Sequence, residues 1–398
     1  PTGRQSKTKQ LGGTSVSTTT LQEIAGKNII RTQTTIAELD RVLGGGMVPG
    51  SLILLSGEPG IGKSTLALMW AVRVPHTLYI SGEESVEQIK LRADRLGLSS
   101  PTLALGNATS VEDILTTIRK QKPALVIIDS VQTMRLDTLE GEAGAVTQIR
   151  ASTATFLDTA KSLGVTIVLI GHVTKDGTVA GPKTLEHLVD TVLSFVGDQH
   201  HGLRILRSAK NRFGGTDEVG IFEMREDGLR DVPNPSQILL AERGEGMPGS
   251  VGTSLLSGSR PMLVEIQALV NKTVFGYPVR KANGFDINRL HMLIAVLERR
   301  AGVQLGQYDI HVNVVGGLDA DEPAADLAVA LAIASAYKDK ALGSDLVVFG
   351  EVGLGGEVRS VRQAEKRIKK CEHLGMKRII LAKHEKISSA SKKIHIIP

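Results

Sequence analysis

Short apolar runs, each followed by a polar or glycine-rich turn, divide the first half of the chain. Such runs are typical of strands buried on both faces of a parallel sheet, and they lie at residues 52–55, 77–81, 125–128, 165–170 and 191–196. Between them the apolar residues recur at helical spacing, over residues 65–74, 86–96 and 149–163. The alternation predicts a doubly wound α/β domain with ligands at the carboxyl ends of its strands.

The pattern changes near residue 234. A predicted strand over 262–270, helices over 287–301 and 324–337 and a βαβ-like end over 346–381 then indicate a second α/β unit. At the other end, residues 1–27 are rich in Ser, Thr, Gly and Lys without an apolar period, as in flexible linkers. We therefore predict three segments, with bounds 1–27, 28–235 and 236–398.

The strand at 52–55 runs into GEPGIGKST, residues 57–65, which fits the phosphate-binding pattern G-x-x-x-x-G-K-[ST]. Glycines let backbone N–H groups turn inward around a phosphate, and the helix that follows directs its positive dipole end there. Lys63 can reach the β- and γ-phosphates, and the Ser64 hydroxyl can hold Mg²⁺. The sequence therefore predicts ATP or ADP binding by Gly57, Glu58, Pro59, Gly60, Ile61, Gly62, Lys63, Ser64 and Thr65.

Composition changes this picture little. The net charge of +5 and the pI near 9.2 weakly favour an acidic partner such as nucleic acid. Aromatic residues make up 3% of the chain, which favours contacts to a nucleic-acid backbone over a stacking platform. No apolar run approaches membrane-spanning length, and the single cysteine, Cys371, excludes disulfides within these residues. We expect a protein of the reducing cytoplasm.

Hydrolysis of ATP requires more groups, and the ends of the predicted strands offer them. Asp129 fits the acid that orients Mg²⁺ through water. Glu83 is the candidate base for the attacking water, with Glu84 as its competitor; either could instead be an acid at a helix N-terminus. His172 and Thr174 are candidate sensors of the γ-phosphate, although a structural histidine is an equally good interpretation.

Lys210 and Arg212 form a basic pair in the stretch KNRFG, on a predicted loop closed by glycine. Such a pair can present charge to a phosphate in the manner of an arginine finger. A solvated hairpin turn is the alternative, and the spacing by itself does not decide between them.

KNRFG, at residues 210–214, is also the motif through which the chain resembles the RadA (Sms) family of bacterial DNA-repair proteins. SGEES at 81–85, GHVTK at 171–175 and EHLVDTVL at 186–193 resemble the same family, over a match from about residue 36 to residue 381. The resemblance implies a RecA-fold, DNA-dependent ATPase that forms hexameric rings. It also implies helicase-like extension or branch migration of the intermediates that the RecA recombinase makes in homologous recombination.

In such a ring, Lys210 and Arg212 would act in trans on the ATP of the neighbouring subunit. Single-stranded or branched DNA would lie in the central channel, against the loops at 134–148 and 175–183.

Two departures from the family pattern matter. The family begins with a Cys₄ zinc finger, so zinc is not expected in this chain; the finger either precedes these residues in a longer protein or is missing from this member. Residues 236–398 resemble the Lon protease domain, but the serine position falls on Ala324 and the lysine position on Glu365, with Lys366 beside it. A Ser–Lys mechanism requires both groups.

We therefore expect the second domain to be an inactive, ring-forming scaffold. Its DNA-facing basic residues would be Arg359, Arg362, Arg367, Lys369 and Lys370, unless these charges only form a solvated helix face. Two other functions compete with this interpretation: an ATP-dependent protease of Lon type, and a nucleotide-switched scaffold without translocation.

Overall fold

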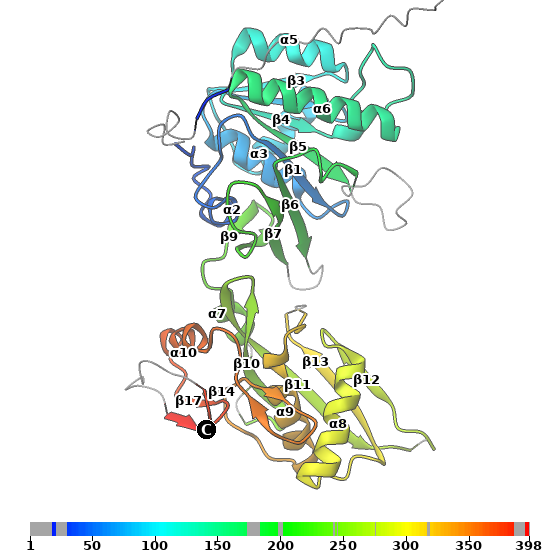
Figure 1. Cartoon of the computed structure of the whole chain (residues 1–398), viewed down its shortest axis with the longest axis vertical. Helices are drawn as coiled ribbons and strands as arrows, with labels where there is room; N and C mark the ends of the chain where they lie inside the picture. The colour runs from blue at the N-terminus through cyan, green and yellow to red at the C-terminus, as the bar shows by residue number, and fades with distance from the viewer. Residues whose placement is uncertain are drawn as a thin grey trace, which may run out of the picture.

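Two large sheets follow one another along the chain in the computed structural model (Figure 1). The structure describes residues 18–20, 30–172, 184–197, 202–241, 243–244, 246–274, 276–316, 319–385 and 395–397. Most of the predicted linker, residues 1–27, therefore lies outside the described residues. None of the helices in the described ranges is long and apolar enough to cross a membrane.

The first sheet has nine strands in the order β3-β2-β4-β5-β1-β6-β7-β8-β9. Its strands are β1 Leu52–Gly57, β2 Thr77–Ser81, β3 Leu103–Asn107, β4 Leu125–Asp129, β5 Thr166–His172, β6 Thr191–Gly197, β7 Leu203–Asn211, β8 Val219–Arg225 and β9 Gly228–Asp231. The first six strands of this order are parallel, and β7, β8 and β9 continue the sheet as antiparallel neighbours. This arrangement confirms the predicted doubly wound, mostly parallel sheet.

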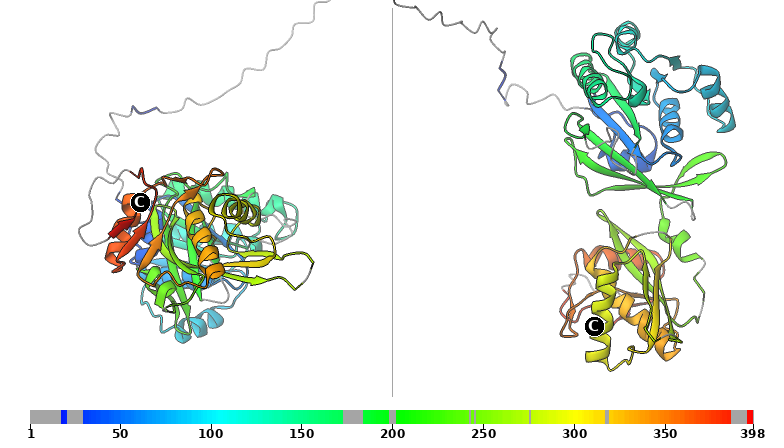
Figure 2. Two further views of the ribbon diagram at one scale, coloured as in Figure 1. Left: turned by 90° about the horizontal axis from the view of Figure 1, so that it is seen from below. Right: turned by 90° about the vertical axis from the view of Figure 1, so that its right-hand side faces the viewer.

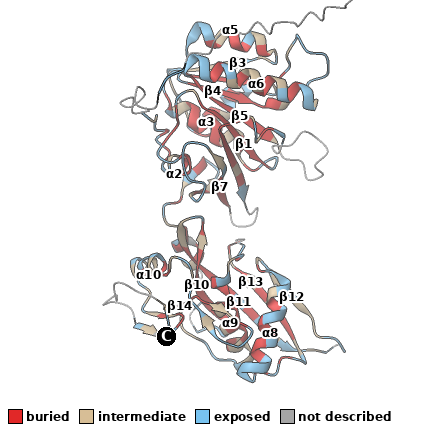
Figure 3. Cartoon of the chain, viewed as in Figure 1, coloured by how far each residue is buried: buried red, intermediate tan, exposed pale blue. Residues whose placement is uncertain are grey.

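Two apolar cores cover the two faces of this sheet, because successive strand residues point to opposite sides. In β1, Ile53 and Leu55 belong to the core that also contains residues of α2, α3 and α4. Leu52 and Leu54 belong to the core with α5 and α6. These helices are α2 Ala37–Leu43, α3 Lys63–Arg73, α4 Val86–Arg95, α5 Val111–Gln121 and α6 Val146–Leu163. Figure 3 shows the buried positions concentrated on the strands and on the inner faces of the helices.

The second sheet has the order β12-β13-β11-β10-β14-β17-β18. Its strands are β10 Ser250–Ser257, β11 Arg260–Lys272, β12 Arg280–Asn283, β13 Tyr308–Val314, β14 Leu346–Val348, β17 Arg378–Ile380 and β18 His395–Ile397, and β15 Glu351–Val352 pairs separately with β16 Val358–Arg359. Its helices are α7 Pro235–Ala241, α8 Ile287–Ala301, α9 Asp326–Lys338 and α10 Ala364–His373. The right-hand view of Figure 2 shows α8 lying against one side of the strands.

Several of these elements had no prediction from the sequence. β3 lies at the edge of the first sheet and is only half-buried, so LALGN shows no marked apolar run. The structure also differs at KNRFG, because Lys210 and Asn211 are the last residues of β7 and pair with β6. The predicted loop is therefore confined to the turn that begins at Arg212.

A buried carboxylate joins the two sheets. Glu38, on α2, is 1% exposed, and its Oε2 accepts from the backbone N–H of Ile221 in β8 at 2.9 Å. The same oxygen lies 2.8 Å from the Arg260 guanidinium at the start of β11. Asp217 also accepts, through its carbonyl, from the N–H of Ser259 at 2.5 Å. The second sheet is thus attached to the first by charged and backbone contacts as well as by apolar packing.

The prediction that Arg367 faces DNA is wrong, because this residue is fully buried. Its NH2 lies 2.6 Å and its NH1 3.0 Å from the Glu322 carboxylate, and NH1 also donates to the carbonyl of Ser254. The guanidinium lies 5.8 Å from the centre of the Phe349 ring. Arg367 therefore serves the core of the second domain.

Replacing Arg367 by Ala should lower the free energy of unfolding by about 3–5 kcal/mol, because it leaves the Glu322 carboxylate without its buried partner. Urea denaturation followed by circular dichroism measures this change. Lys366→Ala, at the exposed neighbouring position, is the control and should stay within about 0.5 kcal/mol of the parent. Equal stability of the two variants would contradict a structural role for Arg367.

Candidate nucleotide site

The predicted phosphate loop connects the carboxyl end of β1 to the start of α3. Gly60 and Gly62 have φ values of +76° and +110°, which non-glycine residues adopt only with strain. A Cβ atom on Gly57 would lie 2.4 Å from the Phe195 carbonyl oxygen of β6. The glycines of the motif are therefore required both by backbone conformation and by the close approach of β6.

Lys63 lies inside this loop and is buried. Its Nζ donates to the carbonyls of Gly57 and Glu58, each at 2.9 Å. Burial lowers the pKa of Lys63, whereas the charges of Asp129 and Glu83 oppose this and raise it. The ammonium group thus lies in the field of both predicted acids.

Asp129 ends β4, and its register partner Ser81 ends β2. The carboxylate is almost fully buried, and its Oδ2 accepts from the Tyr79 hydroxyl at 2.6 Å. Arg92 of α4 donates to the same hydroxyl at 3.2 Å. Burial and the Asp129 charge raise the pKa of Tyr79 well above its usual value, so the hydroxyl stays protonated and continues to donate. The carboxylate that is predicted to orient Mg²⁺ therefore has a fixed orientation.

The structure separates the two glutamates that follow β2. Glu83 Oε1 accepts from the Ser130 hydroxyl at 2.5 Å and lies 3.8 Å from Nε2 of His172. Glu84 instead forms an ion pair with Arg92 at 2.8 Å. Of the two, Glu83 is the one beside the ends of β4 and β5, where a base for ATP hydrolysis has to lie.

His172 ends β5, opposite Gly57 in β1. Burial and the nearby Lys63 charge lower its pKa, against weaker opposing effects of Glu83 and Asp129, which favours the neutral imidazole. Its Nδ1 is buried without a hydrogen-bond partner among the described residues, as is Oε1 of Gln132. Two buried polar atoms thus lie without partners among the described residues at the phosphate end of the sheet. The other candidate sensor, Thr174, and the loop at 175–183 lie outside the described residues.

Lys210 and Arg212 are not at this site. Arg212 forms an ion pair with Asp190 at 3.1 Å, and Asp190 Oδ2 accepts from the N–H of Leu52 at the start of β1. Lys210 Nζ donates to the carbonyls of Glu186 and Val189, at 2.6 and 2.9 Å. The pair therefore lies at the edge of the sheet opposite to the phosphate loop.

Three residues near the site escaped the sequence analysis. Tyr79 and Ser130 resembled ordinary buried strand-end residues, because only tertiary structure brings their hydroxyls to the two acids. Arg204 is different: a charged residue within the apolar run of β7 was a visible signal. It is nearly buried, and its Nε donates to the Ile61 carbonyl of the phosphate loop at 3.2 Å.

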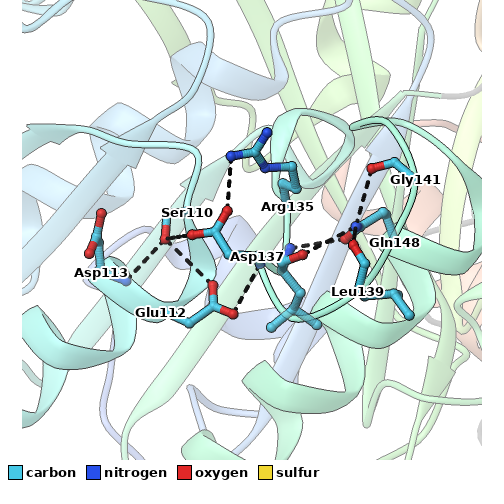
Figure 4. Close-up of polar contacts among 9 residues, drawn as sticks. Ser110, Glu112, Asp113, Arg135, Asp137, Leu139, Gly141 and Gln148 are labelled. Carbon is cyan, nitrogen blue, oxygen red and sulfur yellow. Dashed lines mark hydrogen bonds and ion pairs between the residues drawn. The ribbon is translucent and has the colours of Figure 1, made fainter.

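The loop at 134–148, predicted to contact DNA, has a well-defined hydrogen-bonded conformation (Figure 4). The buried Gln148 carboxamide accepts from the N–H of Leu136 at 2.9 Å and donates to the Leu139 carbonyl at 2.6 Å. The loop contains three acids, Asp137, Glu140 and Glu142, and one cation, Arg135, which pairs with Asp137 at 2.9 Å. This charge balance argues against contacts between the loop and DNA phosphates.

Ser130→Ala should lower ATP turnover about 10- to 100-fold while nucleotide affinity stays nearly unchanged, because Glu83 loses the hydroxyl that orients it. Steady-state ATPase kinetics and fluorescent-nucleotide titration separate these two quantities. The matched control is Ser152→Ala, since Ser152 is buried with no hydrogen-bond partner among the described residues. A parallel fall in affinity and turnover would refute the orienting role.

Comparison with known proteins gives consistent matches along the chain. A family described as AAA domain matches residues 20–178, and one described as subunit ChlI of Mg-chelatase matches residues 288–385. A solved structure of the KaiC-like protein PH0186 from Pyrococcus horikoshii OT3 is 18% identical, with a TM-score of 0.44, over 52% of this chain and all of that chain.

Curated relatives match nearly the whole chain. The DNA repair protein RadA of Halalkalibacterium halodurans is 51% identical over 88% of this chain and 78% of that protein. RadA of Bacillus subtilis strain 168 is 50% identical over the same shares, and RadA of Streptococcus pneumoniae is 48% identical over 92% and 87%. With a RecA-like P-loop ATPase domain followed by a second α/β domain, the chain belongs to the RadA family of DNA repair proteins.

Proposed function

We propose that this protein is a DNA-dependent ATPase of homologous recombination. It would work as a homo-hexameric ring in the cytoplasm. ATP hydrolysis would drive helicase-like movement on single-stranded or branched DNA, and so extend or branch-migrate the intermediates made by RecA. The family membership supports the role in repair, and the residues around the phosphate loop support hydrolysis.

Each residue of the nucleotide site has its own role in the proposed mechanism. The backbone of residues 57–62 and Lys63 would hold the phosphates, and Ser64 with Asp129 would hold Mg²⁺, which supplies charge stabilisation when bound. Glu83 would accept a proton from the attacking water, since Ser130 occupies only its Oε1. His172, kept neutral, would sense the γ-phosphate from the end of β5, beside Glu83.

The observation that carries the proposal is the position of Lys210 and Arg212. Arg212 is tied through Asp190 to Leu52, whereas the phosphate loop begins at Gly57. Leu52 and Gly57, the two ends of β1, are five residue steps apart, about 16.5 Å at 3.3 Å per step. The pair cannot reach the phosphates of its own chain, so we place it against the ATP of the next subunit in a head-to-tail ring.

The residues of the second domain fit a scaffold role better than protease activity. Ala324 is buried beside a cavity of about 400 Å³, and none of the described residues that line this cavity is a lysine. Because a Ser–Lys mechanism needs a hydroxyl nucleophile and an amine together, we assign no peptide hydrolysis to it. ATP-dependent release of peptides from casein would contradict this assignment.

ATPase activity measured with and without single-stranded DNA tests the proposed function. Turnover should rise severalfold with a poly-dT oligonucleotide, because contacts with DNA select the hydrolysis-competent arrangement of neighbouring subunits. Lys63→Ala, which removes the phosphate-binding ammonium, provides the background rate. Equal turnover with and without DNA would favour the competing interpretation as a nucleotide-switched scaffold.

Mixing two inactive variants tests the action in trans. Lys63→Ala should abolish phosphate binding, and Arg212→Ala should lower turnover with ATP affinity nearly intact. If the two residues act across an interface, equal mixing and reassembly should restore about a quarter of the sites, since one neighbour pair in four then joins an intact Lys63 to an intact Arg212. A mixture as inactive as its two components would mean that Lys63 and Arg212 act on the same ATP from within one subunit, and would contradict action in trans.

A further inference from the structure

Two glycines with left-handed backbone conformation flank one fixed residue of the phosphate loop. Gly60 and Gly62 have φ values of +76° and +110°, and Ile61 between them is buried. A Cβ atom on Gly57 would lie 3.2 Å from the Ile61 side chain, so this side chain is packed against the end of β1. Since glycine permits many backbone conformations, the orientation of the peptide groups beside Ile61 depends on their hydrogen bonds.

The carbonyl of Ile61 lies outside the hydrogen-bond ladder of α3. The N-cap of this helix is Gly62, and the N–H of Leu66 donates to the Gly62 carbonyl at 2.9 Å. The Ile61 carbonyl comes one residue earlier, before the ladder begins. The carbonyl of a buried residue requires another donor. Arg204 provides one, because its Nε donates to this oxygen at 3.2 Å.

Arg204 reaches the loop from a strand that is paired on both sides. It lies in β7, opposite Gly197 of β6 and Phe222 of β8, and is 8% exposed. Residues directly opposite one another in an antiparallel pair point to the same face of the sheet, so the arginine side chain passes over Gly197. A Cβ atom on Gly197 would lie 2.4 Å from Arg204 Cδ and 3.1 Å from Ile61 Cδ1. A glycine at this position therefore lets Arg204 and Ile61 come together.

The direction of the Ile61 carbonyl determines the direction of the next N–H group. This carbonyl and the Gly62 N–H belong to one planar trans peptide group, in which they point in opposite directions. A bond that holds the carbonyl toward Arg204 therefore directs the Gly62 N–H away from β7. That N–H is one of the backbone donors with which a G-x-x-x-x-G-K-[ST] loop surrounds a phosphate.

We propose that Arg204 is a positioning residue of the nucleotide site, which orients the Ile61–Gly62 peptide group for phosphate binding. It acts through the backbone of the loop. This assignment rests on the proposed function, because it takes residues 57–64 as the loop that holds the phosphates, and it deepens that function by giving β7 a part in nucleotide affinity. A backbone donor that is oriented alike before and during hydrolysis contributes to binding more than to the rate at saturating ATP.

Two substitutions of matched length separate this hydrogen bond from the charge of Arg204. In glutamine, Nε2 is as many bonds from Cα as Nε is in arginine, so Arg204→Gln keeps an N–H donor for the Ile61 carbonyl. Arg204→Met places a methyl group at that position and donates no hydrogen bond. Both substitutions remove the guanidinium charge and its bond to the Leu203 carbonyl at 3.0 Å. A difference between the two variants therefore reports the bond to Ile61.

Titration with a fluorescent ADP analogue and steady-state ATPase kinetics test the proposal. Arg204→Met should raise the ADP dissociation constant and the KM for ATP about 3- to 10-fold, the effect of one hydrogen bond. Its kcat should stay within about twofold of the parent value. Arg204→Gln should keep the dissociation constant and KM close to those of the parent. Circular dichroism at the assay temperature verifies that both variants are folded.

The matched control is Arg207→Met, which removes an exposed arginine from the same strand and should leave ADP affinity unchanged. Equal weakening of ADP binding by Arg204→Gln and Arg204→Met would assign the effect to lost charge or packing and overturn the proposal. Affinity like that of the parent in Arg204→Met, or a fall in kcat without a change in KM, would overturn it as well. Failure of poly-dT to stimulate the parent protein would reject the proposed function, whereas the ADP affinities of these variants would still decide the role of Arg204.

Discussion

The direction of the parallel strands is the constraint on which the rest of this molecule depends. Because β1, β4, β5 and β6 run the same way, their carboxyl ends bring the phosphate loop, Asp129 and His172 together at one edge. The same direction places Asp190, at the start of β6, with Arg212 at the other edge. A sheet of this length separates the two edges by more than any side chain can span. The proposed action of Arg212 on the ATP of a second subunit thus follows from strand geometry.

A second feature of the first domain is that hydrogen bonds hold three of its carboxylates in position. Asp129 is held by the Tyr79 hydroxyl, Glu83 by Ser130, and Asp190 by the backbone of Leu52. Each bond restricts the rotation of a carboxylate. Its negative charge is therefore already oriented before a nucleotide or a neighbouring subunit binds. In the proposed mechanism the serine bond to Glu83 matters most, since it occupies one carboxylate oxygen and leaves the other for water.

In the second domain, charged side chains form ion pairs inside the core and at the junction with the first sheet. Arg367 and Glu322 form a pair inside the core, near the position where Lon-type proteases have their serine and this chain has Ala324. Glu38 and Arg260 form another at the junction of the two sheets.

The sequence by itself determined the fold class of the first domain and the position of the phosphate loop, because apolar runs and the pattern G-x-x-x-x-G-K-[ST] are local properties of the chain. It also located the helix over 287–301 at the bounds that the structure shows. Only the tertiary structure decided that Glu83 and not Glu84 lies beside His172, that Arg367 is buried, and that Lys210 and Arg212 lie away from their own phosphate loop. Each of these depends on which strands are neighbours and which way a side chain points, and a one-dimensional pattern does not contain that information.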